Sequence, residues 1–468
     1  PLRKRKLRST ARRFPASFAQ RRFWLLEQML DQPGAYNMPV AVRLDGPLNV
    51  DALRRALDTI VTRHAILRTV FPEEQGNPMQ EIRPEGNFAL EERDFSRLAQ
   101  PVRDDQAMAA LTEHAWAPFD LAEGPCMRAL LLRFKPEEHW LQITLHHICS
   151  DGWSLGILTH ELTTLYAAFD AGEADSLEEL TVQYADFAVW QNRQMEAGNL
   201  ASALSYWKRK LADPPVLNLA SDIQRRPLQS YQGTRIPLRL SADLTTKLIS
   251  LARETQSSLF MVLMAAFQIL LARHSGQDDI VVGSPSAGRN RKELEGLIGC
   301  FVNTLALRGD LSGNPSFRSF LAQIRQTAVE AFTHQDVPFE EIVEAVVTDR
   351  TPSRPTLVQA VLALQNAPRG EPASSALSVS PLEPEGMTIR FDLECHLWEN
   401  GDALEGHLVY NDALFTLTAM KRLVEQMERL LTAIVANPDG DLESYDVLSS
   451  GDLCDLEDLG RGPVSVVE

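Results

Sequence analysis

Cysteine, positive charge and long apolar runs are all scarce in this chain. Its 468 residues include five cysteines, Cys126, Cys149, Cys300, Cys395 and Cys454. They lack the CxxC pairs and His–Cys spacings that bind zinc, so we expect neither a metal site nor a disulfide framework. A sparse, odd set of thiols is typical of a reducing compartment, and we expect a cytoplasmic protein.

Basic residues are outnumbered by acidic ones. Lys and Arg total 46 against 63 Asp and Glu, a formal net charge of −17, which argues against nucleic-acid binding. The exception is residues 1–13, which hold seven Lys or Arg and no acid, and which we interpret as a solvated linker. No run of 18 apolar residues occurs, so we predict no membrane helix. No apolar core segment follows the basic stretch, so we predict no secretory signal.

What remains is the composition of a globular protein, 44% hydrophobic and 23% charged. A chain of 468 residues is too long for one ordinary core, which predicts two lobes. Helical periodicity predicts helices at 16–30, 49–64, 104–116, 154–169, 242–255, 259–274 and 418–437, and a helical stretch within 182–212. Strands are predicted at 40–44, 65–71, 127–134, 139–145, 234–240, 279–282 and 298–304. The mixture indicates an α/β fold, with a loop or crossover at 366–382.

The most informative stretch is HHICSDG at residues 146–152. It joins a predicted strand to a predicted helix, a junction that can direct an imidazole out of a rigid sheet. Neighbouring side chains on a strand point to opposite faces, so only one of His146 and His147 can face a cleft. The other would be packed or hydrogen-bonded beneath it. The motif alone leaves open a purely structural histidine pair.

The rest of the motif suggests support for that loop. Asp151 is poorly placed as a triad partner of His147, but it could brace the loop if a buried cation paired with it. Arg68 is the natural candidate, because a guanidinium fork fits a carboxylate. Gly152 would supply a backbone conformation or a close approach that a side chain forbids. We interpret Cys149 as a packing residue rather than a nucleophile.

Two further polar residues have simpler interpretations. Asn303 lies in an apolar stretch, where such a side chain more often satisfies main-chain groups than contacts a substrate. His334 precedes a proline turn, which favours a role in capping or loop packing.

Six segments occur in a fixed order along almost the whole chain. They are SFAQRRFW at 17–24, RHAILRTVF at 63–71, HHICSDGWS at 146–154, YADFAVW at 184–190, IGCFVNTLALR at 298–308 and HQDVPF at 334–339. Together they resemble the condensation domain of nonribosomal peptide synthetases. The HHxxxDG motif alone is shared with other acyltransferases, so the resemblance rests on the ordered set.

The resemblance implies an α/β fold of two chloramphenicol-acetyltransferase-like lobes, a V-shaped pseudo-dimer with a central tunnel. It also implies a bridge between the lobes within 361–395 and a floor loop near 283–300. The expected divisions are a linker from a preceding carrier domain at 1–15, lobes at 16–180 and 181–437, and a linker towards a following domain at 438–468.

The implied activity is peptide-bond formation. An upstream donor and a downstream acceptor carrier domain would deliver thioesters on 4′-phosphopantetheine arms, and the donor acyl group would move to the acceptor's α-amino group. The domain itself would bind no cofactor or metal, and an adenylation domain would adjoin it in the same chain. By the same resemblance His147 is catalytic, His146, Asp151, Gly152 and Arg68 support it, and Trp153, Ser154 and Asn303 line the tunnel.

Details of the motifs narrow the subtype. Both histidines are present, unlike in heterocyclising or fungal terminal members, and FVNTLALR at 301–308 argues against epimerisation. Residues 36–39 resemble elongating members, whereas Ala65 and the pair Arg22–Phe23 depart from the common pattern. The alternatives are a same-fold acyltransferase with a free amine or alcohol acceptor, a condensation domain that also modifies a residue, and a silent docking domain.

Magnitudes favour a positioning role for His147. An α-amino group has a pKa of about 7.7–8.0, so roughly a tenth is already neutral at pH 7. General-base help contributes about 10²–10⁴-fold, whereas holding two reactants in attack geometry supplies about 7–11 kcal/mol. We therefore expect His147 mainly to position the amine and stabilise the tetrahedral intermediate. No Ser or Cys partner is apparent, so no covalent acyl-enzyme is expected.

Overall fold

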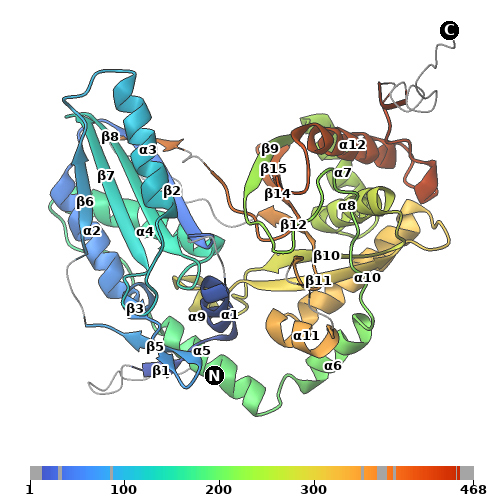
Figure 1. Ribbon diagram of the computed structural model, residues 1–468, viewed down its shortest axis with the longest axis horizontal. Coiled ribbons are helices and arrows are strands. Elements are labelled where there is room, and N and C mark those ends of the chain that lie inside the picture. Colours follow the sequence, from blue (N-terminus) through green and yellow to red (C-terminus); the bar gives the residue numbers. More distant parts are fainter. Residues whose placement is uncertain are drawn as a thin grey trace, which may run out of the picture.

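The computed structural model describes residues 13–29, 34–84, 88–348, 351, 353–365, 377–382, 386–449 and 451–453. These residues form two α/β lobes that diverge as a V (Figure 1). Most of the basic N-terminal segment, residues 366–376 of the predicted crossover and residues 454–468 of the predicted C-terminal linker lie outside the described residues.

The first lobe is built on a five-stranded sheet in the order β13-β2-β8-β7-β6. Its strands are β2 (Asn37–Asp45), β6 (Leu90–Asp94), β7 (Met127–Lys135), β8 (Glu138–His146) and β13 (Ser378–Leu382). The predicted hairpin is confirmed, since β7 and β8 pair antiparallel up to Lys135 and Glu138. Helix α3 (Val102–Trp116) covers one face, while α2 (Val50–Arg63) and α4 (Gly152–Asp170) cover the other (Figure 1).

Covering both faces explains the burial of β8. All nine of its residues are buried, including the polar ones, whereas a half-exposed strand would bury only every second side chain. Leu130 and Leu132 of β7 pack in the small cluster with α3, and Leu131 packs in the larger cluster on the opposite face. The strand that carries the histidine pair is therefore held rigidly from both sides.

A small sheet lies at the base of this lobe. It contains β1 (Arg13–Pro15), β3 (Thr69–Val70), β4 (Glu73–Glu74) and β5 (Asn77–Ile82), next to α1 (Phe18–Met29). The predicted strand over 65–71 is wrong for its first half, because Ala65–Arg68 form a 3₁₀ helix, η1. Arg13–Pro15, expected in a linker, instead pair with β5.

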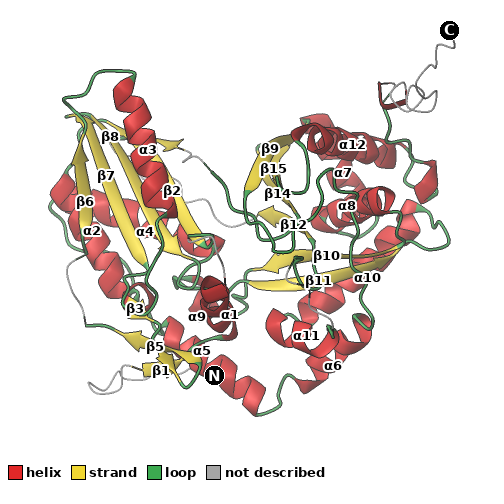
Figure 2. Ribbon diagram, viewed as in Figure 1, coloured by secondary structure: helices red, strands yellow, loops and turns green. Residues whose placement is uncertain are grey.

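The second lobe has a six-stranded sheet in the order β11-β10-β12-β14-β15-β9. The strands are β9 (Gly233–Leu240), β10 (Asp279–Ser286), β11 (Asn303–Asp310), β12 (Ala360–Gln365), β14 (Leu393–Asn400) and β15 (Ala403–Asn411). The helices packed with it are α7 (Ala242–Glu254), α8 (Leu259–Ser275), α10 (Phe317–Thr333) and α12 (Leu417–Ala436), shown red in Figure 2.

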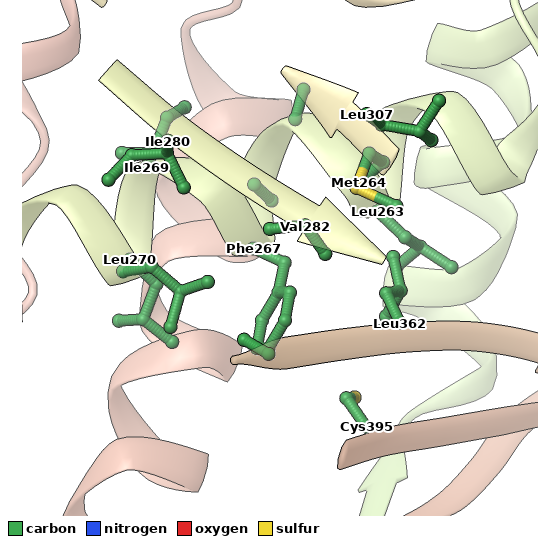
Figure 3. Packing of buried hydrophobic residues seen from close by; sticks show 14 of the residues in the cluster. Leu263, Met264, Phe267, Ile269, Leu270, Ile280, Val282, Leu307, Leu362 and Cys395 are labelled. Atoms are coloured by element: carbon green, nitrogen blue, oxygen red, sulfur yellow. The ribbon is translucent and has the colours of Figure 1, made fainter. Parts of the chain in front are cut away.

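Helix α8 is the centre of this lobe's core. Ten consecutive residues, from Val262 to Leu271, are buried. Figure 3 shows Met264 and Phe267 of α8 beside Val282 of β10 and Leu362 of β12. A helix that is apolar all round fits such a central position. No single helix in the described part of the chain is long and apolar enough to cross a membrane, although the bent pair α7–α8 would pass on length and composition.

Later segments of the chain contribute to the first lobe. Strand β13 pairs antiparallel with β2, from Ser378 opposite Asp45 to Leu382 opposite Ala41, and is the orange strand of the first lobe in Figure 1. This strand confirms the bridge predicted within 361–395. Helix α5 (Tyr184–Glu196) and residues 294–301 also contribute apolar side chains to the first lobe's core, whereas the second core begins at Trp207 on α6 (Ala201–Lys210). The division expected at 180/181 stays a prediction.

The end of the described chain is part of the second lobe. Leu442, Tyr445 and Val447 are buried in its core, and Leu442–Ser444 form a short 3₁₀ helix, η2. The first ten residues of the expected linker at 438–468 therefore pack as structure, because these apolar side chains have a core to enter.

Candidate active site

His146 is the buried member of the histidine pair. It ends β8, opposite Asn37 of β2, and its side chain is fully buried. Its Nδ1 accepts a hydrogen bond from the Ile148 main-chain N–H at 3.1 Å, and its Nε2 lies 3.3 Å from Glu27 Oε2 on α1. In the neutral ring Nε2 therefore carries the proton. The prediction that one histidine is hydrogen-bonded beneath the other is confirmed.

His147 lies just beyond the strand, with 6% of its surface exposed. Its main-chain N–H donates to the Tyr36 carbonyl at 2.9 Å, and its ring stacks on Phe23 with centroids 4.5 Å apart and planes 17° apart. Burial, and next the positive charge of Arg390, lower the pKa of His147 well below its ordinary value. The ring is therefore uncharged at neutral pH, as an amine-binding or proton-accepting group must be.

Asp151 braces the loop as expected, and it also caps α4. Its Oδ1 accepts from the main-chain N–H and the hydroxyl of Ser154, at 2.8 and 2.7 Å. Its Oδ2 accepts from the Phe301 N–H at 2.9 Å. Arg289 Nη2 lies 2.9 Å from Oδ1, with both side chains buried. Every side of the carboxylate is thus satisfied, which is what a buried charge requires.

The predicted pairing of Arg68 with Asp151 is wrong. The η1 turn carries Arg68 towards the small sheet, where its Nη1 donates to the Arg83 carbonyl at 2.6 Å. The cation beside Asp151 is Arg289, which belongs to the predicted floor loop near 283–300.

The floor loop holds Arg289 by its own main chain. Arg289 Nη1 donates to the carbonyls of Leu294 and Leu297, at 2.9 and 2.8 Å, and the guanidinium lies 4.1 Å from the Phe301 ring centroid. Gly288 precedes it with a φ of +64°, and a Cβ there would meet the Phe301 carbonyl at 2.1 Å. In the sequence, Arg289 could have been recognised from the Gly–Arg pair that follows a buried strand.

The same loop replaces part of a predicted strand. The strand expected over 298–304 begins only at Asn303, because residues 298–302 leave the sheet to contact the motif. Gly299 permits the approach, since a Cβ there would meet the Tyr184 ring at 2.0 Å. The floor loop therefore lies against both α4 and α5.

Three residues were predicted to support the site or to line the tunnel, and each has a different environment in the structure. Ser154 is fully buried, and its hydroxyl donates to Asp151 and bonds with Gly299 and Arg289, so its assignment to a tunnel wall is wrong. Trp153 is half-buried, and its Nε1 donates to the Glu295 carbonyl at 3.0 Å. Gly152 is exposed without a positive φ, and a Cβ built there would meet nothing within 4 Å beyond its chain neighbours and its own helix. No protein contact and no unusual backbone therefore requires glycine at this position.

Asn303 satisfies main-chain groups, as its interpretation predicted. Its Nδ2 donates to the carbonyls of Gln335 and Val337, at 2.8 and 2.7 Å, and its Oδ1 accepts from the Phe339 N–H. It also borders a groove of about 600 Å³ between the floor loop and α5. His334 caps α10 and packs on Tyr206 with centroids 4.3 Å apart, which confirms its packing role.

Cys300 was missed as a neighbour of His147. Its Sγ lies 3.8 Å from His147 Nδ1, so the expectation that no cysteine partner exists is wrong. Burial, and then the negative charge of Asp151, raise the pKa of the Cys300 thiol well above its ordinary value. The thiol is therefore protonated and weakly nucleophilic. Cys149 is also fully buried with a strongly raised pKa, which fits packing.

The six sequence segments converge around the motif. The Tyr184 hydroxyl lies 2.8 Å from Ser17 Oγ and donates to the Cys300 carbonyl at 2.6 Å. His64 Nδ1 accepts from the Ile298 N–H at 3.3 Å. The last segment joins through the bond from Phe339 to Asn303. Within the described ranges no group of three or more His, Cys, Asp or Glu side chains could hold a metal ion.

Comparison with known proteins agrees with this geometry. The family model described as "Condensation domain" matches residues 10–456. A linear gramicidin synthase protein of Brevibacillus parabrevis is 40% identical over 444 residues, which cover 94% of this chain but only 9% of that protein. The X-domain from teicoplanin biosynthesis superposes with a TM-score of 0.85 at 27% identity, over 96% of this chain and all of that one.

Two further structures extend the comparison. The same X-domain has been solved in complex with OxyB, with the same TM-score and identity. SgcC5 from Streptomyces globisporus matches with a TM-score of 0.75 at 30% identity, over 91% of this chain and all of SgcC5. The ordered segments, the two-lobed fold and the family match lead to one conclusion: this chain belongs to the condensation domain family of nonribosomal peptide synthetases.

Proposed function

We propose that this domain transfers a donor acyl or peptidyl group from one carrier-bound thioester to the α-amino group of a second carrier-bound substrate. The observation that carries the proposal is the uncharged His147, held at the first lobe's edge by Phe23, Tyr36 and the braced Asp151 loop. The family and the multidomain relatives support carrier-bound substrates and a neighbouring adenylation domain.

His147 positions the acceptor amine and stabilises the tetrahedral intermediate. A neutral imidazole can accept a hydrogen bond from the attacking N–H, and after attack it can take the proton released from nitrogen. Since alignment of the two thioesters provides most of the rate, proton removal is the smaller contribution. The protonated, buried Cys300 leaves the reaction without a thiolate nucleophile, which favours direct transfer.

Gly152 adds a reason to place a substrate at this loop. Gly152 is the first residue of α4, next to Asp151, and a Cβ built on it would point into open space. A pantetheine arm lying against this backbone would account for the absence of a side chain. In this proposal Trp153 and Asn303 line the path of the arms.

A second candidate function is docking without chemistry. The solved complex of the teicoplanin X-domain with OxyB shows that a protein of this fold can bind another protein. The complete histidine pair and the buried Asp151–Arg289 ion pair favour a working site here.

One reconstitution separates these functions. The domain is mixed with a loaded donor carrier, a loaded acceptor carrier and an equal amount of free amine, and the products are identified by mass spectrometry. We expect product on the acceptor carrier and its loss in His147→Ala. Product on the free amine alone would indicate a free-acceptor acyltransferase, and wild-type inactivity with all carriers loaded would favour docking. Near-normal amide formation by His147→Ala would contradict the positioning role.

A further inference from the structure

Arg390 brings a second-lobe side chain to the wall that carries His147. It lies just before β14, and its main chain is held at both ends. The Arg390 N–H donates to Glu394 Oε1 at 3.0 Å, and its carbonyl accepts from Gln229 Nε2 at 2.9 Å. The preceding residue, Ile389, donates to the Tyr231 carbonyl at 2.9 Å. The direction in which the side chain leaves the backbone is therefore fixed.

The guanidinium crosses to the first lobe. Its central carbon lies 5.6 Å from the ring centroid of Tyr36. The Tyr36 carbonyl accepts the His147 main-chain N–H, and the Tyr36 ring contacts Phe23, on which His147 stacks. Arg390 thus lies across the lobe boundary from the catalytic histidine.

Among the residues that the structure describes, the Arg390 guanidinium has no ion-pair partner, whereas neighbouring arginines have one. Arg289 pairs with Asp151, and Arg22 pairs with Glu340 at 3.4 Å. The Nε atoms of Arg390 and Arg289 are both buried without a hydrogen-bond partner, but Arg289 is paired through its two Nη atoms. Within the described ranges no carboxylate lies within ion-pair distance of its guanidinium, and Glu394 is engaged with the Arg390 main chain and His396. An unpaired cation in a partly buried site is costly unless a substrate supplies the missing acceptor.

We propose that Arg390 donates a hydrogen bond to the carbonyl oxygen of the donor thioester as the acceptor amine attacks beside His147. The amine nitrogen forms a bond to the carbonyl carbon, and the displaced π electrons reside on the oxygen that Arg390 contacts. When the C–S bond breaks, those electrons restore the carbonyl, and the leaving thiolate takes up the proton released from nitrogen. Donors aimed at such an oxyanion are worth about 10²–10³-fold in rate. This inference rests on the proposed function.

The same charge acts on His147. The titratable groups that act on the ring are Arg22 of α1, His146 of β8, Cys300 of the floor loop and Arg390. Tyr36 accepts the His147 main-chain N–H, and Glu27 lies at Nε2 of His146. After burial, Arg390 is the largest influence lowering the pKa of His147. Removing the guanidinium should therefore make His147 easier to protonate, an effect that a purely structural arginine would not have.

The test compares Arg390→Met and Arg390→Lys in the full domain with both carriers loaded. Arg225→Gln is the control, because Arg225 pairs with Asp392 in the same lobe and is not among the charges that shift the pKa of His147. We expect the single-turnover rate of Arg390→Met to fall about 10²–10³-fold while the concentration dependence on each carrier stays unchanged. Arg390→Lys should recover part of the rate, and Arg225→Gln should keep the wild-type rate.

A second measurement does not depend on turnover. The domain carries ¹³C-labelled histidine, and the His147 signal, assigned from its loss in His147→Ala, is titrated. Its pKa should rise in Arg390→Met and stay unchanged in Arg225→Gln. A rate within threefold of wild type together with an unchanged His147 pKa would overturn the inference. An inactive wild-type domain would instead count against the proposed function, since the titration would still report on Arg390.

Discussion

The chemistry of His147 is set by its immediate neighbours. Phe23 packs on its ring, Tyr36 accepts its main-chain N–H and Cys300 lies at Nδ1. Burial and Arg390 both favour the uncharged imidazole. By contrast, His146 has both ring nitrogens occupied and can only hold the loop. Of these two adjacent histidines, His146 therefore supports the loop, and His147 is the one to which the proposed function assigns the reaction.

The lowered pKa of His147 predicts which group controls the pH dependence. Because the pKa of His147 lies well below its ordinary value, its titration should leave no break near 6.5 in the single-turnover rate. The acid limb should instead follow the acceptor amine, with about tenfold lower rate per pH unit below the amine's pKa. Measuring the profile with two acceptors of different amine pKa checks this. A break that stays at one pH for both acceptors would show that a protein group controls the limb.

Cys300 should be dispensable for chemistry. Its thiol is protonated and fully buried, so Cys300→Ala should retain a condensation rate within about threefold of wild type. Intact-protein mass spectrometry after incubation with the donor alone should show no acyl adduct. Cys149→Ala, which removes another buried thiol, is the control for packing effects. A stable adduct that disappears in Cys300→Ala would establish covalent transfer.

At the scale of elements, a loop from one lobe meets a helix start from the other. Asp151 caps α4 and receives Arg289, Ser154 and the Phe301 N–H. Further along α4, Glu161 accepts hydrogen bonds from Arg63, the last residue of α2, and from His64, which caps the C-terminus of α2. Helix α4 is thus fixed by buried charges at two points, and its first turn presents the motif.

The Asp151–Arg289 pair should show strong energetic coupling. Asp151→Ala leaves a buried guanidinium unpaired, so we expect a loss of about 3–5 kcal/mol in the free energy of unfolding. A double-mutant cycle with Arg289→Met should give an interaction energy of about 1–3 kcal/mol, measured by urea denaturation. The matched cycle with Arg68→Met should give less than about 0.5 kcal/mol. Equal coupling to both arginines would contradict the assignment of Arg289.

Local patterns predicted the elements well and the long-range pairs poorly. The helical spacing at 154–169 and 418–437 and the turn at 135–138 matched α4, α12 and the β7–β8 hairpin. The partner of Asp151 was misassigned because an ion pair across 138 residues leaves no local periodicity. Residues 298–302 look like a strand because they are apolar, yet they are buried by α5 and the motif instead of a sheet. Tertiary contacts override local preference at these positions.

At the scale of the whole molecule, the two lobes share structure. Strand β13 completes the first sheet, and residues 294–301 fill the first core, although both lie in the second half of the sequence. The site is formed by both lobes as a result. His147 comes from the first lobe. Arg289, Cys300 and Arg390 come later in the sequence than Trp207, the first residue of the second core.

Shared cores predict cooperative unfolding. Calorimetry of the whole domain should show one transition, with a calorimetric enthalpy close to the van 't Hoff enthalpy. Phe301→Ala, within the first core, should lower the transition temperature without splitting the peak. Two resolved transitions in the wild-type domain, of which Phe301→Ala shifts one, would show that the lobes unfold independently.

Strand β13 also constrains how the protein can be made. Its last residue is synthesised 236 positions after the end of β8 (382 minus 146). At about 5–20 residues per second, translation would leave the edge of β2 unpaired for roughly 12–47 s. An open strand edge invites pairing with other chains, so the nascent first lobe is exposed to misassembly until the crossover emerges from the ribosome.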